Sequence, residues 1–366
     1  MSREPTPPRD DVIGAGDMTP QPVNIHGMAA RVSSADTRES LPEMIFGVVS
    51  EALRDADVAM SEIDGIVIAA HDLIDGRSLS SMITGPAAGA YLRDEMRVSD
   101  DALVAVSLGA ARIQAGESAK VVVASWGRAS EGDVERTARA GFDPFVEQPV
   151  VPSDSVISAL RAAAYLRDYS AAGREDACEA RVTRALANPN SVMLSRSPTA
   201  VYPLRPAEVG TDADLAAAVV LGVAPARVRI TGIGHGTDGS LVGIRSCAEF
   251  VGARTAFAQA ANQAGHPVDA VGAVEVVAGS LFEEIMLLEA AGLTSPGTGL
   301  TYYAQTPWIN ATGGSLAGQC YPCSGLLRLV DAARAVRAAG RKATAVVAAG
   351  SAVAMQTTAA VILEAA

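Results

Sequence analysis

Two segments of the chain, 224 residues apart, carry the same pattern, and this repeat restricts the possible folds more than any other feature. Residues 103–116 have apolar side chains at helical spacing and end in glycine, and the valine-rich run 120–125 follows. Residues 327–340 and 344–349 repeat this order. A glycine at the end of a periodic segment is typical of a helix C-terminus, and short apolar runs are typical of buried strands. One helix–strand unit present twice predicts an α/β protein with two similar halves.

Other segments fit this plan, because apolar residues at helical spacing predict helices and short apolar runs predict strands. The expected helices are 41–56, 247–264 and 283–292, and the expected strands are 215–221 and 270–277. Residues 62–70 are expected to form a turn that leads into a central strand, and 227–234 to begin the second half. Residues 142–205 lack simple periodicity, which is typical of a long loop domain that covers a site, or of ordinary connecting segments. We expect a flexible N-terminus over 1–22, a first half over 23–226 that includes 142–205, and a second half over 227–366.

Composition limits the class of protein and of ligand. The 366 residues are 49% hydrophobic but only 4% aromatic, so a large core must be built from small aliphatic side chains, which suits closely packed α/β layers. The net charge of −12 argues against a nucleic-acid partner, because phosphate binding needs clustered Lys and Arg. A smaller anionic ligand would need a local basic patch.

Cysteine use and hydropathy indicate a cytoplasmic protein. The four cysteines are too few for a disulfide framework in a chain of this length. Cys320 and Cys323 have the spacing of a redox motif, but no second pair or His-x-His cluster completes a zinc site, so we expect two small loop residues and no metal. The start of the chain has no apolar core for a signal peptide, and no window approaches the roughly 20 apolar residues of a membrane span.

The loop before the second repeated helix carries the most specific motif. It reads Asn-Ala-Thr-Gly-Gly-Ser-Leu-Ala-Gly-Gln-Cys-Tyr-Pro-Cys-Ser-Gly over 310–325. This loop resembles the last active-site loop of the thiolase superfamily, which reads roughly Asn-x-x-Gly-Gly, then Gly-His-Pro-x-Gly-Ala-Ser-Gly, before an amphipathic helix. Gly318, Ser324 and Gly325 match that pattern, whereas Gln319 occupies the position of the histidine.

Further segments match the same superfamily in the same order. They are 51–58 with 63–67, Asn188-Pro189, 202–205, 211–221, Glu275, 289–293 and 310–314. Single matches of this length are weak, but the ordered set covers about residues 23–365 and is similar to the sterol-carrier-protein thiolase and lipid-transfer branch. The resemblance implies an α/β thiolase fold with five layers, α-β-α-β-α, from two similar halves.

The resemblance also indicates which catalytic groups are missing. Thiolases acylate a cysteine at a helix N-terminus and use histidines, with Asn and water, to activate it and to stabilise the enolate. Ser99 takes the place of the cysteine, and Val277 and Gln319 take the places of the histidines. The C-terminal loop 349–352 also lacks the second cysteine of some members. We expect no classical thiolase activity and expect Ser99 to cap the helix, because the two aspartates after it oppose an anionic acyl intermediate.

In a first interpretation the chain is an enzyme with different chemistry. One branch of thiolase-like proteins lacks Cys and His, cleaves β-hydroxyacyl-CoA by a retro-aldol reaction with tyrosines, and works with an OB-fold, zinc-ribbon partner. Tyr321 would take the β-hydroxyl proton if its pKa were lowered, while amides hold the thioester oxygen. The candidate catalytic residues are Tyr321, Ser99, Asn310, Gln319 and Cys320. The candidate substrate-binding residues are Gly313, Gly314, Gly318, Gly350 and Ser351.

In a second interpretation the chain is a catalytically silent subunit that binds an acyl-CoA or acyl-carrier thioester, or scaffolds an active thiolase. A third alternative is an acyltransferase with Ser99 or Cys320 as nucleophile. In each case coenzyme A enters with the substrate or ligand, and the chain itself holds no cofactor. We expect a homodimer, or a heteromer with a zinc-ribbon/OB-fold protein or an active thiolase, formed through the strand at 120–125, whose apolar edge would otherwise be exposed.

Overall fold

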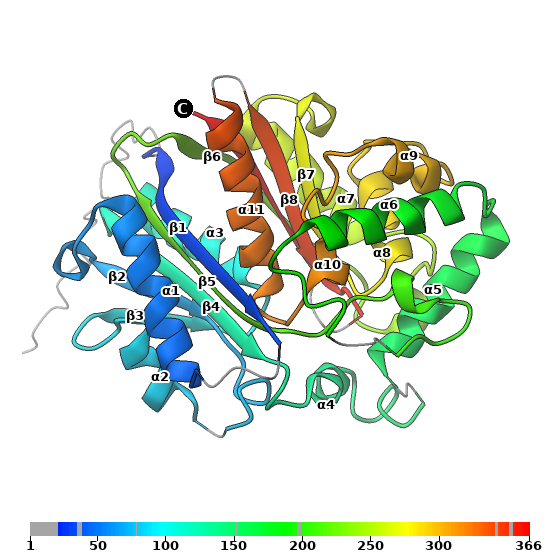
Figure 1. Ribbon diagram of the computed structural model, residues 1–366, viewed down its shortest axis with the longest axis horizontal. Helices are drawn as coiled ribbons and strands as arrows, with labels where there is room; N and C mark the ends of the chain where they lie inside the picture. Colours follow the sequence, from blue (N-terminus) through cyan, green and yellow to red (C-terminus); the bar gives the residue numbers. More distant parts are fainter. Residues whose placement is uncertain are drawn as a thin grey trace, which may run out of the picture.

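In the computed structural model the chain forms a nine-stranded mixed sheet (Figure 1). The described residues are 21–34, 39–77, 79–150, 153–195, 199–340, 343–350 and 354–366. Most of the segment 1–22, predicted to be flexible, lies outside them. The strand order is β3-β2-β4-β5-β1-β6-β9-β8-β7.

The sheet has two similar halves that meet between β1 and β6. The strands of the first half are β1 (Val23–Ser33), β2 (Gly65–Ala69), β3 (Asp94–Val98), β4 (Lys120–Arg128) and β5 (Asp214–Gly222). Those of the second half are β6 (Val228–Thr237), β7 (Ala273–Val277), β8 (Thr344–Gly350) and β9 (Thr357–Ala365). A short antiparallel contact, from Val23 with Ile230 to Ile25 with Val228, joins the halves.

The two repeated strands occupy equivalent places. β4 lies between β2, to which it is parallel, and β5, to which it is antiparallel. β8 lies in the same way between β7 and β9. Val121 pairs with Leu221, and Ala345, which is 224 residues after Val121, pairs with Leu363. The prediction of two similar α/β halves is confirmed.

The α-helices form three layers around the two halves of the sheet. The described helices are α1 (Leu41–Ala56), α2 (Ser81–Ala87), α3 (Ala102–Gln114), α4 (Val134–Ala140), α5 (Asp154–Asp168), α6 (Arg174–Ala187), α7 (Val251–Ala264), α8 (Leu281–Ala290), α9 (Gly299–Gln305), α10 (Gly314–Ala317) and α11 (Ser324–Ala339). α3 and α11 pack in the core between the halves. α1 covers the outer face of the first half, and α7 and α8 cover that of the second (Figure 1). No described helix is long and apolar enough to cross a membrane.

The central strands are buried on both faces, which produces the predicted order of five layers. Val121 and Val123 of β4 point toward α3 and α11, whereas Val122 and Ala124 point toward α1. Successive residues of a strand face opposite sides of a sheet, so a strand covered on both sides reads as a continuous apolar run. This explains why 120–125 and 344–349 contain so few polar residues.

Local sequence explains several element boundaries. α1 spans the predicted range, and Ser40 and Glu43 form a capping box at its start. α8 begins at Leu281, where Ser280 caps the first turn. α7 begins at Val251, four residues later than predicted, and its N-cap residue, Phe250, makes no side-chain hydrogen bond to the first turn. The 142–205 region contains the long helices α5 and α6, which were not predicted because alanine, arginine and acidic residues dominate both.

The expected exposed edge at 120–125 is wrong. This segment belongs to β4, which has a hydrogen-bonded strand on each side. The strands at the ends of the sheet are β3 and β7. Any association through an edge of the sheet must therefore use one of these two strands.

Candidate functional site

Two adjoining cavities form the candidate site, and the smaller one reaches Asp101, the N-cap of α3. The smaller has a volume of about 90 Å³, and the larger has a volume of about 600 Å³. The residues that line both are Val134, Asp154, Asp212, Gly279 and Gln319. These shared walls make the two cavities parts of one site.

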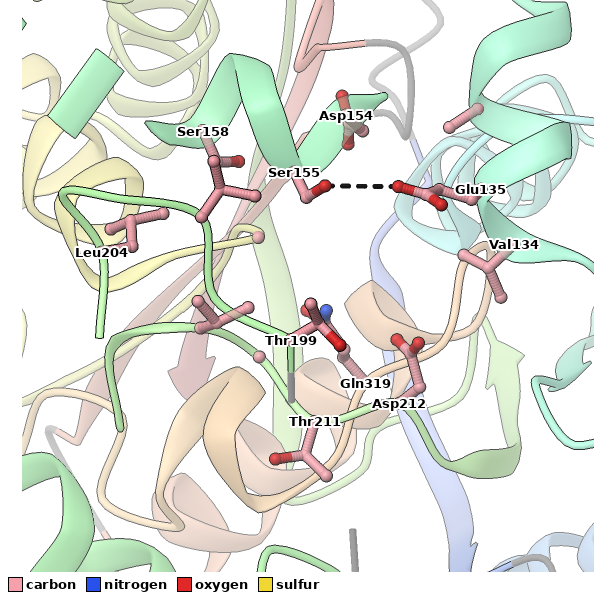
Figure 2. Close-up of a pocket in the computed structure, with 15 residues that line it drawn as sticks. Val134, Glu135, Asp154, Ser155, Ser158, Thr199, Leu204, Thr211, Asp212 and Gln319 are labelled. Carbon is pink, nitrogen blue, oxygen red and sulfur yellow. Dashed lines mark hydrogen bonds between the residues drawn. The ribbon is translucent and has the colours of Figure 1, made fainter. Parts of the chain in front are cut away.

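The larger cavity has acidic walls. α4 and the start of α5 form one wall, and the segment 199–212 with Gly279 and Gln319 forms another (Figure 2). Ser155 donates a hydrogen bond to Glu135 at 3.2 Å, which ties α5 to α4. Glu135, Asp154 and Asp212 line the cavity, and no Lys or Arg of the described chain does. The cavity therefore suits a neutral part of a ligand better than a phosphate group.

The carboxyl group of Asp101 stands at the tip of α3, in the wall of the small cavity. One oxygen accepts the N–H of Leu103 at 2.9 Å, and the other accepts the N–H of Gly325 in α11 at 3.1 Å. Asp101 is 3% exposed. Burial raises its pKa to about 7, although both N–H groups favour the carboxylate. Asp101 can thus gain and lose a proton near neutral pH, which suits acid–base catalysis.

Ser99 lies outside the small cavity. The expectation that it caps α3 is wrong by two residues, because α3 begins at Ala102 and Asp101 provides the cap. Ser99 is exposed and lines neither of the two cavities. Its carbonyl oxygen accepts a hydrogen bond from Tyr321. This placement does not favour Ser99 as a nucleophile.

The phenol of Tyr321 lies in the wall of the small cavity and is half-buried. Its hydroxyl donates a hydrogen bond to the Ser99 carbonyl oxygen at 2.9 Å. Burial, with the nearby carboxyl groups of Asp100 and Asp101, raises the pKa of the phenol. A tyrosine that acts as a base needs the opposite shift, so the condition of a lowered pKa that this role requires is not met. Tyr321 is suited instead to donating a hydrogen bond.

The side chain of Gln319 reaches both cavities. The backbone N–H of Gln319 donates to the Thr211 carbonyl at 2.8 Å, and the backbone carbonyl of Gln319 accepts the N–H of Ala213 at 2.9 Å. Gly210 leaves space for the side chain, because a Cβ there would overlap the Gln319 amide. The amide makes no hydrogen bond to a residue that the structure describes, and it points into the larger cavity in Figure 2. An N–H group in this position can hold the oxygen of a bound thioester.

Cys320 and Cys323 are buried thiols, and burial raises the pKa of both. The Cys323 thiol donates to the Ser125 carbonyl at 3.3 Å. The Cys320 sulfur packs against Gly127, where an added Cβ would lie 2.6 Å away. A thiol held in its protonated form is a weak nucleophile, so this environment does not favour Cys320 as the acylated residue.

The amide of Asn310 is bound to the sheet. Its Oδ1 accepts the N–H of Val276 at 2.8 Å, and its Nδ2 donates to the Val276 carbonyl at 3.1 Å. Asn310 is fully buried and lines neither cavity. Gly313 and Gly314 also lie outside the cavity walls and have φ angles of 94° and 54°. A Cβ on Gly314 would lie 2.6 Å from the Asn310 amide nitrogen, so these residues shape the turn.

Arg328 of α11 donates hydrogen bonds to both ends of the segment 312–318. Its Nη1 donates to Thr312 Oγ1 at 2.6 Å and to Asp331 Oδ2 at 2.8 Å. Its Nη2 donates to the carbonyl oxygens of Gly314 at 2.8 Å and Gly318 at 3.0 Å. The Arg328 side chain is 3% exposed. Gly318 contributes through its backbone, which sets the position of the glutamine that follows.

A pair of carboxyl groups that the sequence did not single out lines another wall. Asp154 of α5 lines both cavities, and Glu283 of α8 lines the small one. Asp154 accepts the N–H of Ala354 at 3.0 Å, and Arg161 binds Glu283 at 2.7 Å. Burial and the neighbouring Glu283 raise the pKa of Asp154 to about 7. In the sequence Asp154 is typical of an ordinary first-turn helix residue, because only tertiary contacts set it apart.

The remaining candidate binding residues belong to the C-terminal loop. Gly350 lines the small cavity. Ser351 lies outside the described residues. Within the described ranges, no group of three or more His, Cys, Asp or Glu side chains is placed to hold a metal ion.

No family model and no curated protein matches this sequence, but solved structures do. The match to the Ltp2-ChsH2(DUF35) aldolase has 20% identity and a TM-score of 0.77, and covers 95% of this chain and 99% of the other. That to the monomeric SCP2-thiolase like protein type 1 from Mycobacterium smegmatis has 18% identity and a TM-score of 0.70, and covers 93% and 77%. That to the Acat5 thiolase from Ascaris suum, in complex with coenzyme A, has 16% identity and a TM-score of 0.67, and covers 94% and 100%.

These likenesses show the fold, and the chain has the thiolase fold. The neighbours are consistent with the resemblance to the thiolase superfamily and its sterol-carrier-protein thiolase branch. Identities of 20% or less do not carry a reaction from one chain to another. The residues of the two cavities must carry that argument.

Proposed function

We propose that this protein cleaves a carbon–carbon bond of a β-hydroxyacyl thioester by a retro-aldol reaction, without the cysteine and histidines of thiolases. The observation that carries the proposal is that Asp101, Tyr321 and Gln319 all line the small cavity. They supply a carboxyl group that titrates near neutral pH, a hydroxyl donor and an amide open to a ligand. A retro-aldol cleavage needs these three kinds of group. A neighbour of the same fold is an aldolase by name, which supports the choice of reaction.

The reaction begins at the β-hydroxyl group. The Asp101 carboxylate takes the hydroxyl proton. The Tyr321 hydroxyl turns its single proton from the Ser99 carbonyl oxygen to the substrate and donates a hydrogen bond to the same β-oxygen. The bond between Cα and Cβ breaks, and an aldehyde or ketone leaves. The electron pair of that bond passes into the thioester as an enolate, whose oxygen the Gln319 amide stabilises. Return of one proton to Cα gives the shorter acyl thioester, so no oxidant or second substrate is needed.

A coenzyme A thioester would place only part of itself in the site. The described cavity walls hold Glu135, Asp154 and Asp212 but no Lys or Arg. We expect the acyl group and the neutral pantetheine arm inside, and the phosphates outside in solvent. An acyl-carrier protein presents the same arm and is an alternative donor. The Acat5 thiolase, which shares the fold, is in complex with coenzyme A, and this supports a thioester ligand.

A partner chain is part of the proposal. β3 is an end strand of the sheet, and the segment before it exposes apolar side chains, among them Leu79, Met82, Ile83 and Leu92. An edge strand beside such a surface favours pairing with a second copy or with a zinc-ribbon/OB-fold protein. One neighbour carries two protein names, Ltp2 and ChsH2(DUF35), whereas another is monomeric, so the fold is compatible with either state. Light scattering that gives a stable 37.4 kDa monomer and no complex would rule the partner out.

A catalytically silent subunit is the second candidate function. The position of Asn310 favours the silent subunit. Its side-chain oxygen and nitrogen both bind the Val276 backbone, and the residue lines neither cavity, so it is not placed to hold an enolate oxygen. Under this alternative the chain binds a thioester, or supports an active thiolase, without turnover. Partner binding would then survive the loss of Asp101 and Tyr321.

Acyl transfer has less support. Ser99 lies outside both cavities, and the Cys320 thiol is held in its protonated form. Incubation with acetyl-coenzyme A should therefore leave no added acyl mass on the intact protein. A clear acetyl adduct would restore the acyltransferase alternative.

Mass spectrometry of the two products formed from short β-hydroxyacyl thioesters, with any partner present, tests the retro-aldol proposal. Asp101→Asn removes the titrating group and should lower turnover by roughly 10²–10⁴-fold. Asp133→Asn is the matched control, because Asp133 caps α4 with its side chain and is exposed. No cleavage by the wild type, or equal cleavage by wild type and Asp101→Asn, would overturn the proposal.

A further inference from the structure

We infer that Asp154 is a second catalytic residue, which exchanges a proton with the α-carbon of an acyl thioester bound in the small cavity. The retro-aldol reaction as proposed needs a donor for this proton. Asp101 and Tyr321 act at the β-oxygen, so the α-carbon needs a separate group. The inference rests on the proposed function only in that an acyl thioester must be the ligand.

Asp154 stands where the two cavities meet. It is the first residue of α5 and lines the larger cavity (Figure 2). It also lines the small cavity. Its Oδ1 accepts the N–H of Ala354 at 3.0 Å, which fixes the rotation of the side chain. Its Oδ2 makes no hydrogen bond to a residue that the structure describes. One oxygen of the carboxyl group thus binds the protein backbone, and the other is open to a ligand.

Asp154 and Asp101 belong to different walls of the small cavity. Asp101 is held by α3 and α11, through the N–H groups of Leu103 and Gly325. Asp154 is held by α5 and by the turn before β9, through Ala354. A thioester between these walls can meet one carboxyl group at its β-oxygen and the other at its α-carbon.

The turn that Asp154 holds is constrained. Ala354 and Met355 have φ angles of 47° and 50°, in the left-handed region that residues other than glycine rarely adopt. Arg161 and Arg245 donate to the Ala354 carbonyl oxygen at 2.5 and 3.0 Å. Backbone that several side chains hold in a costly conformation is typical of functional sites. Met355 lines the small cavity, so these contacts also set the position of its wall.

The charged groups around Asp154 allow it to take up and release a proton. Glu283 of α8, Glu135 of α4 and Arg161 of α5 face it. Glu283 is paired with Arg161 at 2.7 Å and accepts hydrogen bonds from two serine hydroxyls. Glu283 is therefore already bound to other protein groups, whereas burial and the nearby Glu283 raise the pKa of Asp154 to about 7. Asp154 can therefore change charge near neutral pH.

The proton exchange balances without a further reactant. The Asp154 carboxylate takes a proton from Cα, and the electron pair of the C–H bond enters the thioester as an enolate. The carboxyl proton exchanges with solvent, and the enolate then takes a solvent-derived proton back from Asp154. In heavy water the α-hydrogens of the thioester are replaced by deuterium, although no carbon–carbon bond is formed or broken.

Deuterium uptake by acetyl- or propionyl-coenzyme A, followed by NMR, tests the inference. The wild type should exchange α-hydrogens well above the rate in buffer. Asp154→Asn keeps an acceptor for the Ala354 N–H but cannot carry the proton, so exchange should fall roughly 100-fold or more. Asp154→Glu retains a carboxyl group and should keep part of the exchange, which separates proton transfer from folding. Asp176→Asn, the same change at an exposed first-turn position of α6, should exchange like the wild type.

Each outcome decides between the two proposals. Equal exchange by wild type and Asp154→Asn overturns the role of Asp154, whether or not the protein cleaves β-hydroxyacyl thioesters. No exchange by a wild type that binds the thioester overturns it as well. Exchange that is lost in Asp154→Asn, in a protein without cleavage activity, supports the role of Asp154 and overturns the retro-aldol function.

Discussion

The N-terminal ends of α3 and α11 occupy equivalent places in the two halves, but they differ in charge. Asp101 lies 224 residues before Gly325, the same offset that relates Leu103 to Leu327. The hydrogen bond from the Gly325 N–H to Asp101, at 3.1 Å, therefore joins two equivalent positions. A Cβ on Gly325 would overlap the Asp101 carboxyl group, so the glycine of one half makes room for the acid of the other.

The repeated elements of the two halves form the scaffold, whereas the side chains that differ between the halves form the site. The sheet and its two central helices are repeated, and they place two helix ends side by side. The chemistry lies in the residues that are not repeated. Arg328 illustrates the same point one turn further on, because its equivalent in the first half, Val104, only packs against the core.

The largest effect on stability is expected at Arg328, which is the charged counterpart of the apolar Val104 in the first half. Arg328→Met removes a guanidinium that binds Asp331, Thr312 and two loop carbonyls in a buried place. Removal of one partner from a buried ionic network costs about 3–5 kcal/mol of unfolding free energy. Denaturant unfolding measures it, with Arg334→Met, an exposed change on the same helix, as the control. Equal stability of Arg328→Met and wild type would mean that other contacts hold the loop.

Adding a side chain at Gly325, at the N-terminal end of α11, should have the next largest effect on stability. Gly325→Ala places a Cβ against the Asp101 carboxyl group and should cost about 3 kcal/mol of stability, as overpacking in a closed space does. Gly243→Ala, where a Cβ meets nothing within 4 Å, is the control. Asp101→Ala in the same chain should recover much of the loss. If the double variant were no more stable than Gly325→Ala, the cost of the added methyl group would not come from its overlap with the Asp101 carboxyl group.

Asp101 should make the stability of the protein depend on pH, whereas Gly325, its equivalent in the second half, has no group that titrates. The pKa of Asp101 rises from an ordinary 3.8 to about 7 on folding. Between these values the folded protein keeps a proton that the unfolded chain has released, so stability falls as pH rises. The expected contribution is about 2 kcal/mol between about pH 5 and 6.5, since one pKa unit corresponds to 1.36 kcal/mol.

Melting temperatures of wild type and Asp101→Asn across this range measure the contribution. The substitution should flatten the pH dependence without removing it, because Asp154, whose pKa is also raised to about 7, contributes with the same sign. Identical curves for the two proteins would indicate that Asp101 is ionised throughout the folded range.

The scaffold is predictable from sequence because its signals are local. A helix that ends in Gly116 or Gly340, followed by a short apolar run, is enough to locate α3, β4, α11 and β8. α5 and α6 escape prediction because their contacts with the second half, rather than a marked apolar stripe, stabilise them. Local patterns therefore predict the repeated core and miss the region that covers the site.

The site is less predictable because it depends on contacts between distant segments. An aspartate at the start of a helix is typical of an ordinary cap, and neither Asp101 nor Asp154 differs from this pattern until Gly325 and Ala354 are placed beside them. Tyr321, which the motif singled out, lines the small cavity. The direction of its pKa shift could not be anticipated, because burial and two aspartates cause it.

The smallest effect on stability is expected at the hydroxyl that links the two halves. Tyr321 belongs to the loop before α11, and its hydroxyl donates to the Ser99 carbonyl just before α3. Tyr321→Phe removes this bond, and a single hydrogen bond contributes about 0.5–1.5 kcal/mol, with the lower end expected for a half-buried group. Thermal unfolding should therefore change little.

Turnover should respond differently if the hydroxyl acts on the substrate. Loss of the donor at the β-oxygen should lower the rate of retro-aldol cleavage by roughly 10²–10⁴-fold. Tyr169→Phe is a suitable control, because Tyr169 is the C-cap residue of α5 and lines neither cavity. A large loss of turnover with little loss of stability would place the function of this contact in the reaction. Equal rates for wild type and Tyr321→Phe would end the tyrosine mechanism, and equal partner binding without turnover would favour the silent subunit, in which the two helix tips only hold the halves together.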